Sequence, residues 1–104
     1  MRTYDEIRQI IDAFVDERQW RPYHTPKNLA LSISIEAAEL LEIFQWVSSD
    51  EAVDTQLEHI KEELADVLIY AHMLASTLDL DIPTIIQDKM IKNAIKYPLP
   101  ETGK

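Results

Sequence analysis

Two short segments decide how this chain folds: Ile35-Glu36-Ala37-Ala38-Glu39-Leu40-Leu41-Glu42 and Glu62-Glu63-Leu64-Ala65-Asp66-Val67. Both lie within long apolar runs that are typical of helices. Each carries two acids three residues apart, Glu36 with Glu39 and Glu63 with Asp66, so each pair lies on one helical face. Carboxylates on an otherwise apolar face are costly unless something neutralises them, and a hard divalent cation does so for four acids at once. The segments therefore predict two helices that share one metal site.

Composition narrows the class of protein. The 104 residues are enough for one domain, which we expect to span 1–104, with a modest core. One glycine and five prolines are too few turn residues for an all-β domain, and the lack of cysteine excludes disulfides and thiolate zinc sites. A net charge of −9 argues against binding to a nucleic-acid polymer. It still allows a nucleotide ligand if metal ions mask the acids.

The sequence carries no visible targeting or membrane segment. The N-terminus lacks a signal pattern, and Glu, Ser and Asp interrupt the longest apolar stretches. We expect a cytoplasmic protein that does not bind membranes.

Apolar periodicity and capping residues predict four helices. The first follows a Thr3–Glu6 capping box and runs to about Arg18. The others are expected over residues 26–47, 53–78 and, after a cap at Asp81, to about residue 96. Residues 98–104 should form a loose tail.

Short connections between successive helices favour antiparallel packing. The predicted fold is all-α, a four-to-five-helix bundle of antiparallel helices. The helix over residues 26–47 is apolar around much of its circumference, so some of its neighbours should come from another subunit. We therefore expect an oligomer.

The acids also suggest which metal binds. Oxygen ligands alone favour Mg²⁺, Mn²⁺ or Ca²⁺. A di-iron bundle would need Glu-x-x-His on each of two helices, and no such motif occurs. Mg²⁺ on a carboxylate cluster could bind a phosphate chain and activate water. The alternative is a helical dimerisation module whose acids are merely solvated charges.

Cationic and aromatic side chains could complete a nucleotide site. Those near the predicted helices are Lys27, Lys89, Lys92, Lys96, Trp20, Tyr23, His24, Trp46 and Tyr70. The lysines could hold phosphates or serve only solubility, and the aromatic rings could wall a base or belong to the core. His59, one turn before Glu63, could support that acid.

An ordered set of motifs gives the chain a family resemblance. It comprises Phe14-x-x-Glu17-Arg18-x-Trp20, His24-x-Pro26-Lys27-Asn28-Leu29, Glu39-Leu40-x-Glu42-x-Phe44-Gln45-Trp46, Glu63-Leu64-x-Asp66-Val67-Leu68-Ile69-Tyr70 and Lys92-Asn93-x-x-Lys96-Tyr97-Pro98. With the paired acids, this set resembles the MazG-like all-α nucleoside triphosphate pyrophosphohydrolases. It is most similar to the small single-domain branch that includes dCTP pyrophosphatases.

The resemblance implies an activity and a set of roles. The expected reaction is Mg²⁺-dependent hydrolysis of a nucleoside triphosphate to monophosphate and pyrophosphate, with Mn²⁺ as a substitute metal. Its catalytic metal ligands would be Glu36, Glu39, Glu63 and Asp66, and Glu39 would also orient the attacking water. The base and sugar pocket would be lined by Trp20, His24, Trp46, Tyr70 and Asn93. The phosphate contacts would be Lys27, Asn28, Lys92, Lys96 and Tyr97.

The resemblance leaves the substrate open. House-cleaning of dCTP or modified pyrimidine nucleotides is one possibility, and phosphoribosyl-ATP or dUTP hydrolysis on the same scaffold is another. The family also implies a homodimer or a homotetramer built as a dimer of dimers.

Overall fold

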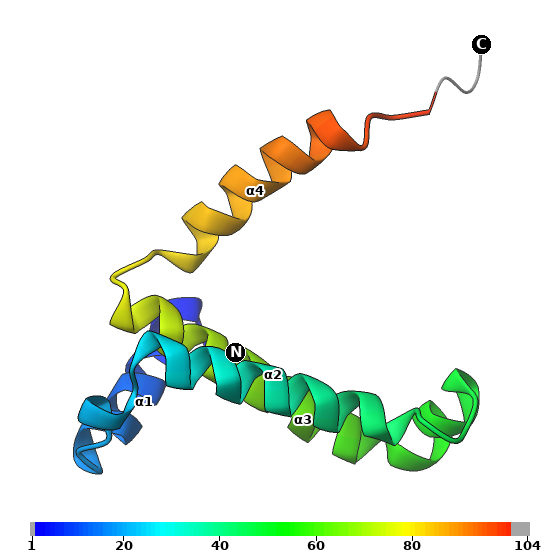
Figure 1. The fold of residues 1–104 in the computed structure, drawn as a ribbon, viewed down its shortest axis with the longest axis horizontal. Helices are drawn as coiled ribbons and strands as arrows, with labels where there is room; N and C mark the ends of the chain where they lie inside the picture. The colour runs from blue at the N-terminus through cyan, green and yellow to red at the C-terminus, as the bar shows by residue number, and fades with distance from the viewer. Residues whose placement is uncertain (1, 101–104) are drawn as a thin grey trace.

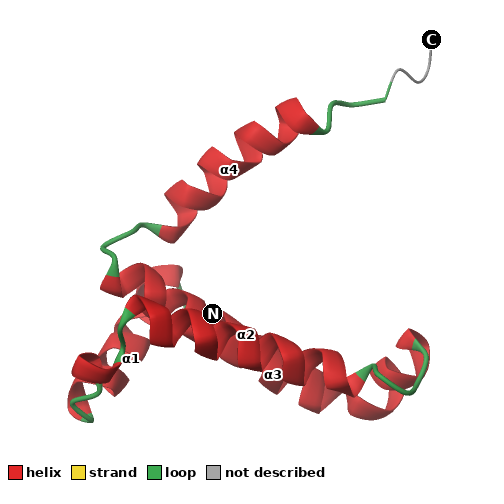
Figure 2. Ribbon diagram, in the orientation of Figure 1, coloured by secondary structure: helices red, strands yellow, loops and turns green. Residues whose placement is uncertain are grey.

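The computed structural model describes residues 2–100, which form helices and connections with no strand among them (Figures 1 and 2). The elements are α1 (Tyr4–Glu17), the short 3-10 helix η1 (Arg21–Tyr23), α2 (Pro26–Ile43), α3 (Ser49–Thr77) and α4 (Ile82–Lys96). The prediction of an all-α fold is confirmed.

Polar side chains fix where the helices begin. Thr3 Oγ1 accepts a hydrogen bond from the Glu6 backbone N–H, and the Glu6 carboxylate accepts one from Thr3, so the predicted capping box is present. Thr25 caps α2 ahead of Pro26, and Asp81 caps α4. These starts follow directly from local sequence.

The connection between α2 and α3 differs from its prediction. Helix α2 ends at Ile43 instead of about residue 47, and α3 begins at Ser49 instead of about residue 53. Ser48 is the reason for the early start, since its hydroxyl accepts the Glu51 backbone N–H. Apolar periodicity alone could not locate that cap. Helix α3 also bends at Gln56, whose φ of −127° and ψ of 20° are not helical.

Helices α2 and α3 lie side by side and antiparallel, and α1 packs across α3 (Figure 1). The small core lies where these three helices meet, with Leu29 only 1% exposed. Its members are Ile11, Val15, Leu29 and Met73, with Ile69, Tyr70 and Leu74 packed against them. This core holds α1 against the half of α3 that follows the paired acids.

Two polar contacts also join α1 to α3. The Tyr4 hydroxyl lies 3.2 Å from His72 Nδ1, and the Ser76 hydroxyl donates to Asp12 Oδ1 at 3.3 Å. Partial burial lowers the pKa of His72, so the fold favours the neutral ring. His72 therefore helps to join α1 to α3.

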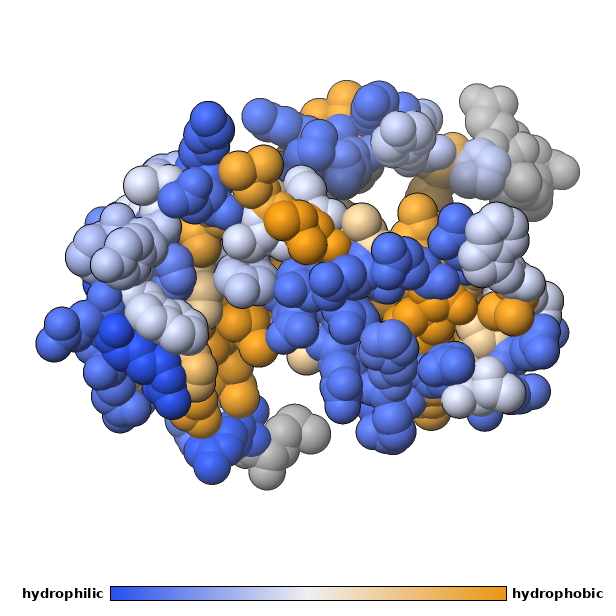
Figure 3. Space-filling view, turned by 60° about the horizontal axis from the view of Figure 1, so that its bottom comes forward, coloured by the Kyte–Doolittle hydropathy of each residue, from blue (hydrophilic) through white to orange (hydrophobic). Residues whose placement is uncertain are grey.

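Helix α4 stands apart from the other three (Figure 1). The chain turns away at Asp79, whose φ of 56° lies in the left-handed region. Much of the apolar surface of α4 is exposed, including Ile86, Met90 and Ile95. In Figure 3, hydrophobic side chains likewise lie open between hydrophilic ones on the face shown. The antiparallel pairing of α2 and α3 matches the expected bundle, whereas α4 does not close it within one chain.

None of the helices in residues 2–100 is long and apolar enough to cross a lipid bilayer. The expected cytoplasmic location stays a prediction, as does the single domain. Residues 98–100 follow α4 without regular structure, and the rest of the expected tail lies outside the described residues.

Replacing Leu29 by Ala should destabilise the protein. The side chain is 1% exposed, so its truncation leaves a cavity among α1, α2 and α3 at a cost of about 2–5 kcal/mol. Denaturant or thermal unfolding measures the loss. The matched control is Leu99→Ala, since Leu99 is 92% exposed and should be neutral. Equal stability of the two variants would contradict this core.

Candidate metal centre and adjoining cavity

Three carboxylates converge where α2 and α3 run antiparallel. Glu36 and Glu39 come from α2, Glu63 comes from α3, and one oxygen of each lies within 4.8 Å of the other two. The three-residue spacing on α2 turns both of its acids toward α3. The structure thus brings together three of the four acids singled out in the sequence.

Part of this cluster is buried without hydrogen-bond partners. Oε2 of Glu36 and Oε2 of Glu63 have no partner among the described residues, and the Glu63 side chain is only 14% exposed. An unpaired carboxylate oxygen removed from water is costly. A cation bound between the helices would remove that cost.

The cluster also shifts a proton equilibrium. Loss of water around the carboxyl raises the pKa of Glu36 to about 7, helped by the neighbouring carboxyls of Glu63 and Glu39, which could share an added proton, and by the charges of Glu39 and Asp66. Binding a proton or a cation near neutral pH would relieve the repulsion among these acids. Crowded, oxygen-only ligands with free lone pairs fit a hard divalent ion such as Mg²⁺ or Mn²⁺.

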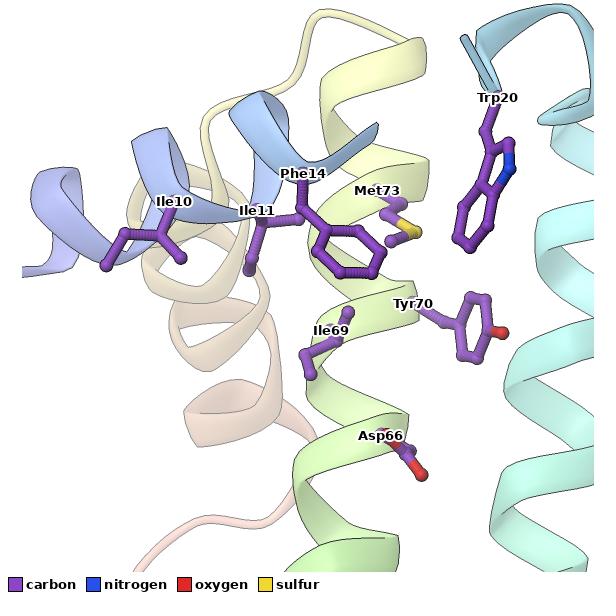
Figure 4. A pocket seen from close by; sticks show the side chains of 8 residues that line it. All are labelled: Ile10, Ile11, Phe14, Trp20, Asp66, Ile69, Tyr70 and Met73. Atoms are coloured by element: carbon purple, nitrogen blue, oxygen red, sulfur yellow. The ribbon is translucent and has the colours of Figure 1, made fainter. Parts of the chain in front are cut away.

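Asp66 lies one helical turn beyond Glu63 and borders a cavity of ≈ 340 Å³ (Figure 4). The close-up shows side chains from α1, α3 and the connection before α2 pointing into this space, with Asp66 at one end. The lining residues are Ile10, Ile11, Phe14, Trp20, Asp66, Ile69, Tyr70 and Met73. An apolar, aromatic cavity thus lies next to the acids.

Aromatic contacts shape one wall of the cavity. The rings of Phe14 and Trp20 meet edge to face with centroids 5.5 Å apart, and His24 lies 6.3 Å from Trp20. The Arg18 guanidinium covers Phe14 at 3.5 Å. A flat, partly apolar ring could lie against this wall.

A second, more polar hollow of ≈ 330 Å³ adjoins the same acids. It is lined by Glu39, Glu42, Ile43, Gln56, His59 and Glu63. His59 Nε2 lies 3.4 Å from Glu63 Oε1, as its position one turn earlier on α3 suggested. The acids are therefore bordered by an apolar cavity at Asp66 and a polar hollow at Glu39 and Glu63.

The other residues singled out in the sequence are dispersed. Trp20 and Tyr70 line the cavity, with His24 beside Trp20. Lys27 and Asn28 are exposed at the start of α2, where the Asn28 amide donates to the Tyr23 carbonyl at 3.0 Å. Trp46, in the connection between α2 and α3, is 86% exposed.

Four more of these residues belong to α4 or its end. Helix α4 extends away from the acids of the same chain (Figure 1) and carries with it Lys92, Asn93, Lys96 and, at its end, Tyr97. Asn93 contacts Met90 Sδ at 3.8 Å, and Lys96 Nζ lies 5.3 Å from the Tyr97 ring. Within one chain they do not join the site.

Sequence reasoning missed part of the cavity wall. None of the candidate site residues from the sequence is Ile10, Ile11, Phe14 or Met73, yet all four line it. Only Phe14 had a signal in the sequence, as the first residue of the motif that ends at Trp20. Apolar side chains that face a cavity and those that face a core have the same periodicity, so spacing cannot separate them.

Known proteins are similar to this chain in sequence. The sequence profile of the MazG-like family matches residues 31–104. Mouse (Mus musculus) dCTP pyrophosphatase 1 is 37% identical over 102 residues, which cover 93% of this chain and 60% of the relative. The human (Homo sapiens) protein of that name is 37% identical over 101 residues, which cover 92% of this chain and 59% of the relative. The chain thus spans about 60% of the length of these curated relatives.

A solved structure covers nearly the whole chain. The crystal structure of a pyrophosphatase from Archaeoglobus fulgidus superposes with a TM-score of 0.89 at 47% sequence identity. The match covers 95% of each chain.

Replacing Glu36 by Gln should stabilise the protein in EDTA, and more at pH 8 than at pH 5. A pKa raised from 4.5 to about 7 means that the folded state binds this proton more tightly than the unfolded state. Stability therefore falls as pH rises between these values, and the full penalty stands above pH 7. The neutral amide removes it. Melting temperatures at both pH values measure the difference.

The control for this comparison is Glu62→Gln, because Glu62 is exposed on α3. It should give a small shift that is the same at both pH values. An equally pH-independent shift for Glu36→Gln would contradict the buried, crowded site.

Proposed function

Because this chain belongs to the MazG-like family, we propose that it is a divalent-metal-dependent nucleotide pyrophosphohydrolase. It would cleave the α–β anhydride bond of a nucleoside triphosphate with water, releasing the monophosphate and pyrophosphate. One observation carries the proposal: three carboxylates lie within 4.8 Å of one another on α2 and α3, next to an aromatic cavity.

Glu36, Glu39 and Glu63 would hold the metal, with Asp66 as a fourth ligand at the cavity end. Bound Mg²⁺ supplies charge for the phosphate chain and makes water a better nucleophile. Mn²⁺ takes the same oxygen ligands and would substitute. Glu39, which also faces the polar hollow, is the acid we assign to orient the attacking water and accept its proton.

The apolar cavity would receive the base. Trp20 and Tyr70 offer aromatic surfaces for it, and Phe14 packs edge to face against Trp20. Asp66 at the end of the cavity fixes the direction of the nucleotide, with the base beyond Asp66 and the phosphates over the acids. His24, Lys27 and Asn28, at the start of α2, would contact the sugar or phosphates.

For the substrate we propose dCTP or a modified pyrimidine nucleotide, on the strength of the dCTP pyrophosphatases of mouse and human. Phosphoribosyl-ATP and dUTP are the alternatives on the same scaffold. A non-enzymatic dimerisation module is the third possibility, but solvated surface acids would not bury carboxylate oxygens without partners.

We also propose that the protein works as a homodimer or a dimer of dimers. Leu31, Ile35 and Leu41 on α2 are more than half exposed, and so are Ile86 and Ile95 on α4. Apolar surface on this scale is typical of a subunit interface. In such an assembly, α4 of one copy would bring Lys92, Asn93, Lys96 and Tyr97 toward the acids of another. Trp46 would be covered in the same way.

The activity test uses purified protein, Mg²⁺ and a panel of deoxy- and ribonucleoside triphosphates with phosphoribosyl-ATP. We expect monophosphate and pyrophosphate, with dCTP as the preferred substrate. Glu39→Gln and Asp66→Asn should each lower kcat/KM by at least about 100-fold, because each loses a ligand or the water-orienting acid. Both variants should still fold.

Glu62→Gln is the matched control for the activity test and should retain turnover. Release of a nucleoside diphosphate and orthophosphate, or full activity in both acid variants, would refute the proposed pyrophosphohydrolase. A different preferred triphosphate would change only the substrate assignment.

Sedimentation equilibrium should give at least twice the monomer mass of 12.1 kDa. Leu41→Glu should shift the distribution toward monomer, because it places a charge on exposed apolar surface of α2 that an interface would bury. Leu99→Glu serves as control, since Leu99 lies beyond α4 and is already 92% exposed. A monomer at micromolar concentrations in the unsubstituted protein would rule out the assembly.

A further inference from the structure

The two oxygens of the Glu63 carboxylate have different surroundings. Oε1 lies 3.4 Å from His59 Nε2. Oε2 is buried and has no hydrogen-bond partner among the described residues. One oxygen therefore lies within reach of a side chain of the same helix, and the other has free lone pairs inside the acidic cluster.

His59 is placed to hold that arrangement. It lies four residues before Glu63 on α3, so both side chains project from one face. It is half exposed at the polar hollow that Glu39 and Gln56 also line. The bend of α3 at Gln56 lies just before His59. A ring that carries its proton on Nε2 can donate to Oε1 while remaining neutral.

We propose that His59 is a positioning residue for the metal centre: it holds Oε1 of Glu63, which fixes the carboxylate with Oε2 available to a divalent cation shared with Glu36 and Glu39. The inference rests on the metal of the proposed function. Carboxylate ligands whose second oxygen is hydrogen-bonded lose less freedom when they bind a metal.

Helix stabilisation is a weaker explanation of the contact. An acid that precedes a base by four residues is the favourable order in a helix, and here the histidine comes first. A pair whose histidine is 52% exposed to water adds little to folding. Such a pair would also not require a buried, unpaired oxygen on the other side of the carboxylate.

The test is titration calorimetry of the metal-free full chain with Mn²⁺, without nucleotide. His59→Ala should weaken Mn²⁺ binding by roughly 10-fold or more. His59→Gln keeps a side-chain N–H and should remain within about threefold of the unsubstituted protein. The control Lys61→Ala removes an exposed cation that pairs with Glu58 at 3.1 Å, and should leave the affinity unchanged.

Three outcomes would overturn the inference. They are no Mn²⁺ binding by the unsubstituted protein, unchanged affinity in His59→Ala, and equal losses in His59→Ala and His59→Gln. Circular dichroism of each variant checks that α3 is intact. Pyrophosphate release, measured on the same samples, separates this inference from the proposed function. A protein without turnover whose Mn²⁺ affinity follows the expected pattern refutes only the hydrolase, and the reverse result refutes only the role of His59.

Discussion

The candidate site depends on the closeness of the carboxylates that α2 and α3 bring together. Glu36, Glu39 and Glu63 present oxygens within 4.8 Å of one another, and burial denies two of those oxygens a partner. The pKa of Glu36, raised to about 7, expresses the same strain. Apolar side chains at these positions would make the protein more stable, because buried charges rarely stabilise a protein. The pairing of α2 and α3 therefore places these carboxylates where they could bind a cation together.

The acids have apolar surroundings on one side and polar surroundings on the other. Toward the core of α1 and α3, the neighbouring space is apolar and aromatic, with Trp20 and Tyr70 on its wall. Toward the bend at Gln56 it is polar, and His59 contacts Glu63 there. A nucleotide has the same division between a flat base and a charged phosphate chain. Membership of the MazG-like family and the likeness to a pyrophosphatase of known structure agree with this layout.

Helix α4 depends on a different constraint. A chain of this size has little interior, and the core formed by α1, α2 and α3 involves few residues. Helix α4 extends from that core with apolar side chains exposed along its length. Much of the apolar surface of α4 is thus exposed in a single chain, and the proposed assembly would cover it. In the proposed assembly, the contact between chains that covers α4 would also bring its polar residues to the acids of another copy.

The sequence by itself determined the helices, their caps and the chemistry of the acids. Thr3, Thr25 and Asp81 act locally, through hydrogen bonds to backbone groups three residues away, so their roles can be predicted without a fold. The three-residue spacing of the acids is equally local. Only the tertiary structure decided that Glu36, Glu39 and Glu63 meet while Asp66 borders a cavity, and that Phe14 and Met73 line that cavity. It also decided that Lys92 and Lys96 lie away from the acids of their own chain. The reason is physical: periodicity gives the face of a helix on which a side chain lies, but packing between helices decides what that face meets.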